Sequence, residues 1–201
     1  MTPDLASVGA GTGTARRRPL RAAALLAAAL AALSPASAAE FELHSPTFDA
    51  TKPLPSLHLY AGFGCSGENR SPALEWSGAP AGTRSFALTL YDPDAPTGSG
   101  WWHWIVYDLP GSTRGLPADA GAVGGQRLPA AARMGRTDFG TAAFGGACPP
   151  AGDPPHRYVL TLHALKTEHL DVPPDASGAM IGFAIHAAAL GSTSIVVRFG
   201  R

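Results

Sequence analysis

The sequence has few charged residues and no long apolar run. Lys, Arg, Asp and Glu make up 15% of its 201 residues. The apolar stretch from Ala22 to Leu33 is shorter than the about 20 residues that a membrane-spanning helix needs, so we expect no membrane anchor. The motifs Gly-x-Ser-x-Gly and His-Glu-x-x-His are absent. The sequence therefore lacks the nucleophile motif of α/β-hydrolases and a common zinc-protease motif.

The first 39 residues resemble a signal peptide rather than part of a fold. Four arginines between Arg16 and Arg21 precede the Ala22 to Leu33 stretch, and the small residues Ala36 to Ala39 follow it. A basic segment, an apolar segment and a small-residue cleavage site are the three parts of a bacterial secretory signal. We expect residues 1–39 to be a signal peptide, residues 40–201 to form a single domain, and the protein to be periplasmic or secreted.

Removal of this segment leaves a slightly acidic chain. The segment holds four of the 15 Lys and Arg residues and one of the 15 Asp and Glu residues, so 11 basic and 14 acidic residues remain, a net charge of −3. Such a balance gives no general attraction to nucleic acid or to anionic membranes. We therefore expect no nucleic-acid partner, and any bound anion must be held by a local site.

The chain contains two cysteines, Cys65 and Cys148, each in a glycine-containing segment. Exported proteins meet an oxidising environment, in which paired cysteines form disulfides. We expect a Cys65–Cys148 disulfide, the alternative being two unpaired thiols.

Most of the remaining pattern is that of β-strands. The longer expected strands are 85–91, 102–108, 157–165 and 193–199, and the shorter ones are 42–44, 57–60 and 73–76. In the first of these, Phe86, Leu88 and Leu90 alternate on one face. One helix is expected, capped by Asp175, with apolar residues at positions 180, 183, 184, 187 and 190, and ended by Gly191.

Four polar side chains lie at predicted strand ends. Asp92 ends one strand, His103 lies at the start of the next, and His156 and Tyr158 begin a third. If the first two strands pair as antiparallel neighbours and the third runs parallel to the second, all four side chains meet at one edge of the sheet. Taken singly, each has a structural alternative: a turn aspartate, a core histidine, an exposed strand end and a core tyrosine.

Several longer motifs occur in one order along the chain. They are Tyr91-Asp92-Pro93-Asp94-Ala95-Pro96, Gly100-Trp101-Trp102-His103-Trp104, Thr137-Asp138-Phe139-Gly140, Cys148-Pro149-Pro150 and Pro155-His156-Arg157-Tyr158. Together they resemble the phosphatidylethanolamine-binding protein family, and more narrowly its bacterial, Raf-kinase-inhibitor-like branch. The resemblance covers nearly all of residues 40–201.

This resemblance implies a mainly β fold of two antiparallel sheets in Greek-key order, with one main C-terminal helix before a last strand. It also implies a small pocket for phosphate-type anions such as a phospholipid head group. Carried over position by position, the ligand-binding residues are Asp92, His103, His156 and Tyr158, with Asp94, Pro96, Trp102 and Pro150 as pocket walls. Animal members continue into a further helix that helps to cover the pocket, so we expect a more open pocket here.

Two classes of function follow. The first is a binding or inhibitor protein without enzymatic activity or cofactor, which recognises an anionic group on a free metabolite, a lipid head group or a modified partner protein. The second is an enzyme, either a hydrolase that uses Asp92 and a histidine as acid and base, or a metal-dependent enzyme with Asp92, His103 and His156 as ligands. Because no nucleophile or zinc motif supports the second class, we expect the first.

Overall fold

The computed structural model describes residue 11 and residues 40–201. The predicted signal peptide, Gly11 apart, lies outside the described residues. In chain order the elements are β1 (Glu42–His44), the short 3₁₀ helix η1 (Ser56–His58), β2 (Ala61–Gly62), β3 (Cys65–Ser66), β4 (Leu74–Ser77), β5 (Ser85–Asp92), β6 (Trp101–Pro110), β7 (Gly115–Leu116), β8 (Arg133–Met134), β9 (His156–Leu165), α1 (Gly178–Ala188) and β10 (Ala189–Phe199).

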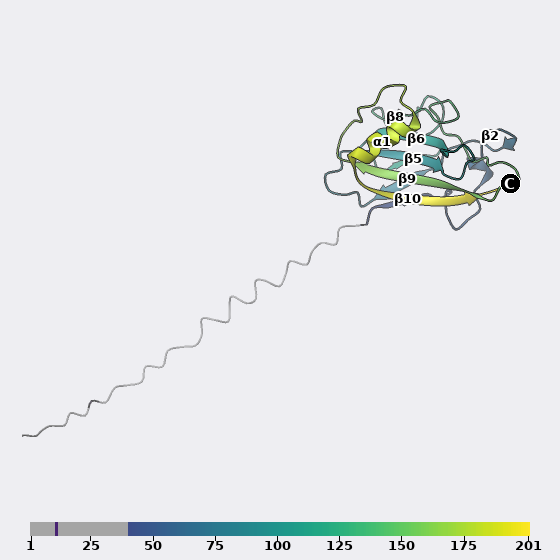
Figure 1. Cartoon of the computed structure of the whole chain (residues 1–201). Helices are drawn as coiled ribbons and strands as arrows, with labels where there is room; N and C mark the ends of the chain where they lie inside the picture. The colour runs from purple at the N-terminus through teal and green to yellow at the C-terminus, as the bar shows by residue number, and fades with distance from the viewer. Residues whose placement is uncertain (1–10, 12–39) are drawn as a thin grey trace, which may run out of the picture. The chain divides into compact units, whose positions relative to one another are not determined.

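The main sheet has five strands in the order β10-β9-β5-β6-β8, and every neighbouring pair is antiparallel (Figure 1). The four longer predicted strands are confirmed as β5, β6, β9 and β10. Because β6 and β9 both pair antiparallel with β5, they run parallel to each other on its two sides. The end of β5 therefore lies beside the beginnings of both β6 and β9, at one end of the strands.

One face of this sheet forms the larger core. Phe86, Leu88 and Leu90 of β5, predicted to share a face, are all fully or almost fully buried there. They pack in one cluster with Leu74 and Trp76 of a second, three-stranded sheet, whose order is β1-β4-β7. The expected mainly β fold with two antiparallel sheets and one main helix is confirmed, and β2 and β3 form an additional two-stranded ladder.

Helix α1 covers part of the opposite face, although not with the side predicted from the sequence. Its buried apolar residues Ile181, Ile185 and Ala188 pack in one cluster with strand residues of the main sheet. The predicted apolar positions Met180 and Phe183 are instead 50% and 75% exposed. The helix is apolar on several sides, so its periodicity did not distinguish the buried face.

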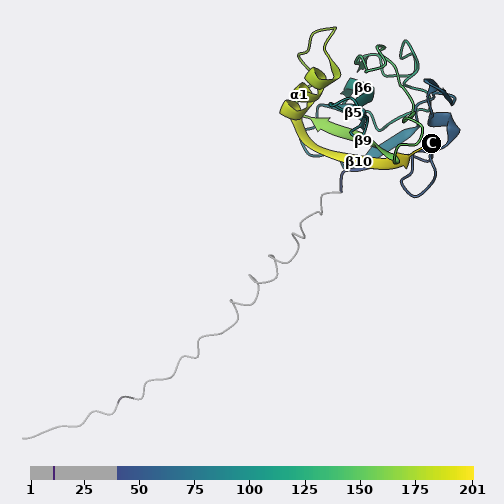
Figure 2. The same cartoon turned by 45° about the vertical axis from the view of Figure 1, so that its right-hand side comes forward.

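The start of α1 also differs from the prediction. Ser177, rather than Asp175, is the N-cap, and its side chain accepts a hydrogen bond from the backbone N–H of Met180. The first helical residue, Gly178, lies against the indole of Trp102, where a Cβ atom would come within 2.7 Å of the ring. A glycine is thus required for the helix to approach β6 this closely. Figure 2 shows α1 at one end of β10 and the C-terminus at the other.

The shorter predicted strands differ in outcome. Residues 42–44 form β1 as expected, and the strand expected at 73–76 is β4, shifted by one residue. The strand expected at 57–60 is wrong, because Ser56–His58 form a 3₁₀ turn after Pro55, and Leu59 makes only an isolated bridge with Ala147. Of the helices within the described residues, none has both the length and the hydropathy that crossing a membrane requires.

Candidate functional site

A cavity of about 220 Å³ lies where β5 ends and β6 and β9 begin. Six of the eight predicted ligand-binding residues line it: Asp92, Pro96, His103, Pro150, His156 and Tyr158. The remaining lining residues are Phe63, Ala95, Thr97, Trp101, Phe139, Cys148 and Pro149. The cavity therefore has a few polar groups at a common place and a largely apolar and aromatic wall, which is the usual composition of a small-molecule site.

The central polar contact joins Asp92 to His156. Nδ1 of His156 lies 2.7 Å from Oδ2 of Asp92, and both residues are 3% exposed. Oδ1 of Asp92 accepts a second hydrogen bond from the backbone N–H of Asp94. The carboxylate therefore keeps a proton on Nδ1 of His156 and orients the ring. On the other side of the ring, Nε2 lies 3.5 Å from Oδ2 of Asp153.

His103 is held in a different way. Its Nδ1 lies 2.8 Å from the carbonyl oxygen of Gly145, to which it donates, so Nε2 is the nitrogen that remains for a ligand. Burial lowers the pKa of His103 below its ordinary value of 6.5, despite the carbonyl partner and the nearby Asp92 charge. His103 is thus mostly neutral at neutral pH. The hydrogen bond between an imidazole and the Asp92 carboxylate is thus made by His156 and not by His103.

Tyr158 contributes a polar atom without a partner. Among the described residues, no group has the geometry of a hydrogen bond with its buried hydroxyl. The backbone N–H of Cys148 is near enough to lower the pKa of the phenol slightly, but it can only donate to the oxygen, so the O–H proton has no acceptor. Burial, reinforced by the charge of Asp92, raises the pKa of Tyr158, so the phenol keeps its proton. A buried donor without an acceptor costs about 1–3 kcal/mol. Because Tyr158 lines the cavity and its ring packs edge-on against His103 at 5.2 Å, an acceptor bound there would satisfy the hydroxyl.

Two predicted wall residues lie elsewhere. Trp102 does not line this cavity; it packs against α1 and lies 4.6 Å, between ring centroids, from Tyr91. Trp101, its neighbour, lines the cavity together with His103. Residues two apart on a strand share a face and adjacent residues do not. The pocket wall predicted at Trp102 is therefore formed by Trp101, one position earlier.

Asp94 is the second of these residues, and it has a structural partner. Its carboxylate accepts hydrogen bonds from the backbone N–H, Nε and Nη2 of Arg157, at 2.6 to 2.9 Å. These bonds hold the pKa of Asp94 well below its usual range. The pair attaches the loop after β5 to the start of β9, next to Asp92 and His156. Asp94 therefore supports the site rather than forming its wall.

Sequence reasoning did not identify the aromatic wall. Phe63, Trp101 and Phe139 all line the cavity, and the Phe139 ring centroid lies 5.3 Å from that of His103. Phe139 belongs to one of the motifs quoted above and Trp101 to another, but neither was predicted to line the cavity. Phe63 lies in a short glycine-rich segment with no periodic pattern.

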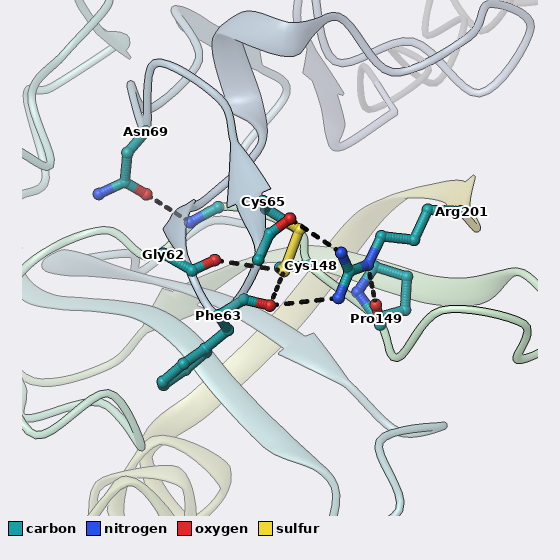
Figure 3. Close-up of a disulfide and its surroundings, with 9 residues drawn as sticks. Gly62, Phe63, Cys65, Asn69, Cys148, Pro149 and Arg201 are labelled. Atoms are coloured by element: carbon teal, nitrogen blue, oxygen red, sulfur yellow. Dashed lines mark hydrogen bonds between the residues drawn. A yellow bond between two sulfur atoms is a disulfide. The ribbon is translucent and has the colours of Figure 1, made fainter.

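The predicted disulfide between Cys65 and Cys148 is confirmed (Figure 3). It joins the β2–β3 segment to the loop before β9, and Cys148 itself lines the cavity. Closing a loop of 83 residues stabilises the folded state by about 4–5 kcal/mol if the chain-entropy model holds. Beside the disulfide, the guanidinium of Arg201 donates to carbonyl oxygens of Phe63, Gly64 and Pro149.

In the metal-dependent alternative, Asp92, His103 and His156 would be the ligands. Among residue 11 and residues 40–201, no three or more His, Cys, Asp or Glu side chains form a group that could hold a metal ion. A larger groove of about 710 Å³ lies over the small sheet, but none of the predicted site residues lines it. The cavity at the edge of the main sheet is therefore the candidate site.

Comparison with known proteins agrees with this fold. The family model described as phosphatidylethanolamine-binding protein matches residues 44–200. This chain belongs to that family.

Relatives include the UPF0098 protein YbcL of Escherichia coli, 51% identical over 160 residues, which cover 80% of this chain and 87% of the relative. A protein of Mycobacterium tuberculosis named "Putative lipoprotein LppC" is 35% identical over 196 residues, covering 97% of this chain and 89% of that protein. The crystal structure of E. coli YbcL, described as a new member of the mammalian PEBP family, superimposes with a TM-score of 0.79. It shares 49% identity, and the match covers 81% of this chain and 99% of YbcL.

Proposed function

We propose that this protein is a non-enzymatic binding protein whose cavity takes a small anion of the phosphate type. The observation that carries the proposal is the buried Tyr158 hydroxyl, whose proton has no acceptor among the described residues and which lines the same cavity as His103 and His156. Phosphate oxygens are strong acceptors. One bound phosphate could accept hydrogen bonds from the phenol and from the imidazoles. The hydrogen bond to the phenol would offset the free-energy cost of burying its hydroxyl.

The hydrogen bonds of the two histidines support the same conclusion. In each ring, Nδ1 is already engaged, by Asp92 in His156 and by the Gly145 carbonyl in His103. Nε2 is then the ring nitrogen that can meet a ligand, and it donates to an anion only when the ring is protonated. A negatively charged ligand favours that protonated form, since an opposite charge nearby stabilises the imidazolium.

The cavity wall offers little for covalent catalysis. Of its thiol and aliphatic hydroxyl side chains, Cys148 is in a disulfide, and the Thr97 hydroxyl donates to the carbonyl oxygen of Gly100. We therefore favour binding over hydrolysis. The shared ligand chemistry fits a free phosphate metabolite, a phospholipid head group or a phosphorylated partner protein that the domain would inhibit.

Two observations support export to the periplasm or beyond. The first is the Cys65–Cys148 disulfide, since such bonds persist in oxidising compartments. The second is the extensive similarity to a mycobacterial protein with a lipoprotein name. We propose that residues 1–39 are the segment that directs this export and that residues 40–201 form the exported domain.

Calorimetric titration with methyl phosphate at several pH values tests the function. Because the pKa of His103 lies below 6.5, we expect affinity to rise as pH falls below that value. The phosphate itself gains a proton near pH 6, so methyl sulfate, whose charge is constant over this range, is the control ligand. His103→Ala should remove most of the pH dependence. Binding that is independent of pH, or equal in wild type and His103→Ala, would contradict the proposal.

A further inference from the structure

Phe63 is a large apolar side chain that is 67% exposed at the cavity. Its backbone has φ of +53°, in the left-handed region that bulky non-glycine residues rarely occupy. Such a conformation costs about 1–3 kcal/mol and persists only where the surrounding structure imposes it. An exposed phenyl ring in an unfavourable backbone conformation does little for the stability of the fold, which suggests a role in binding.

The structure around Phe63 holds this conformation on both sides (Figure 3). Arg201 donates from Nη2 to the carbonyl oxygen of Phe63 at 3.2 Å and from Nη1 to that of Gly64 at 3.0 Å. Its Nε donates to the carbonyl oxygen of Pro149 at 2.7 Å, on the opposite segment of the cavity rim. The disulfide of Cys65, two residues after Phe63, joins the same two segments.

The ring of Phe63 is part of an aromatic wall that reaches the polar groups. It is nearly parallel to the ring of Phe139, with an interplanar angle of 16° and centroids 6.0 Å apart, and Tyr60 contacts both. Phe139 in turn lies edge-on to His103. A ligand whose charged end meets His103 and Tyr158 therefore has an aromatic surface directly beside its uncharged end.

From this arrangement, which deepens the anion-binding function proposed above and rests on it, we propose that the preferred ligand is an organic phosphate with a flat apolar ester group. The phosphoryl group lies at His103, His156 and Tyr158, and the ester group contacts Phe63 and Phe139. Arg201 acts as a positioning residue, because its three hydrogen bonds keep the Phe63 segment against the Pro149 segment.

Calorimetry with inorganic phosphate, methyl phosphate, hexyl phosphate and phenyl phosphate tests the proposal at one pH. Favourable aromatic contacts of this kind correspond to an affinity gain of about three- to tenfold for phenyl over methyl phosphate. Phe63→Ala should remove most of this gain, so that phenyl and methyl phosphate bind the variant with similar affinity, whereas Phe63→Trp should retain it. The matched control is Phe183→Ala, since Phe183 is 75% exposed on α1 and does not line the cavity.

Arg201→Ala should likewise reduce the preference for phenyl phosphate while methyl phosphate binds as before, because Arg201 acts through Phe63 and not on the phosphoryl group. If no phosphate binds at all, the proposed function itself fails. If the four ligands bind alike, if hexyl phosphate equals phenyl phosphate, or if Phe63→Ala weakens all of them equally, the aryl preference is overturned while anion binding stands.

Discussion

Nδ1 of His156 and Oδ2 of Asp92 lie 2.7 Å apart, and this contact links the first residue of β9 to the last residue of β5. The two strands are neighbours in the main sheet, so the contact continues their backbone ladder with a buried, charged hydrogen bond. The Asp92 carboxylate thereby fixes the orientation of the His156 ring. The same carboxylate also places a negative charge beside a site that we propose to bind anions.

Asp92→Asn should lower the free energy of unfolding by about 1.5–3 kcal/mol, because hydrogen bonds to charged groups contribute that much. Urea denaturation at pH 7 measures this change. Asp49→Asn is the control, since the Asp49 carboxylate bonds only to exposed groups of its own turn. Equal stability of wild type and Asp92→Asn would mean that the buried contact contributes nothing.

Asp153→Asn should raise the affinity for methyl phosphate. Oδ2 of Asp153 lies 3.5 Å from Nε2 of His156, where its negative charge would compete with a ligand oxygen and repel an anion. Removing one partly screened charge at this range should strengthen binding by about fivefold at low ionic strength, and less at high salt. Isothermal titration at two salt concentrations checks both statements. Weaker binding in the variant would instead assign Asp153 a supporting role.

Tyr158→Phe should stabilise the folded protein but weaken its binding of phosphate. Removing the hydroxyl deletes a buried donor without a partner among the described residues, so the unliganded protein should become more stable by about 1 kcal/mol. The phosphate, however, loses one donor, and its affinity should fall by about fivefold or more. Thermal unfolding with and without methyl phosphate reveals both effects. A variant that is destabilised and binds normally would show that the hydroxyl has a structural role.

His163 should make the protein less stable in acid. Burial, with a contribution from the charge of His186, lowers its pKa from 6.5 to about 4. Since the unfolded chain takes up the proton at higher pH than the folded protein, stability is fully present above pH 6.5 and falls as pH decreases toward 4, by up to about 3 kcal/mol.

Replacing His163 with Gln should flatten this part of the stability curve. Urea denaturation at intervals from pH 7 to pH 4 provides the measurement. His44→Gln serves as the comparison, because His44 is an exposed histidine of β1. A variant curve that follows the wild-type curve throughout would assign the acid sensitivity to other groups.

The sequence predicted the main sheet because its strands alternate clearly, as Phe86, Leu88 and Leu90 do in β5. It also placed Asp92, His103 and His156 near one another, since strand ends that meet at one edge follow from antiparallel pairing. Helix α1 was harder, because Met180 and Phe183 form an apolar stripe as regular as that of Ile181 and Ile185.

The missed parts of the site depend on contacts between distant segments. Adjacent tryptophans differ only in which face of β6 they occupy, so the choice between Trp101 and Trp102 required the register. The role of Asp94 became clear only from its contact with Arg157. Phe63 lies in a glycine-rich turn, where no periodic pattern reports which side chains face a cavity.

The first residues of strand β6 take part both in the cavity and in the contact with α1. Trp101 and His103 line the cavity, and Trp102 between them supports the first turn of α1, at the contact with Gly178. A methyl group added by Gly178→Ala has no space there, so the strain must move the helix or the start of β6. Distant substitutions under α1 can thus alter ligand affinity without touching the ligand, and titrating Gly178→Ala with methyl phosphate would measure how strongly the two sides are coupled.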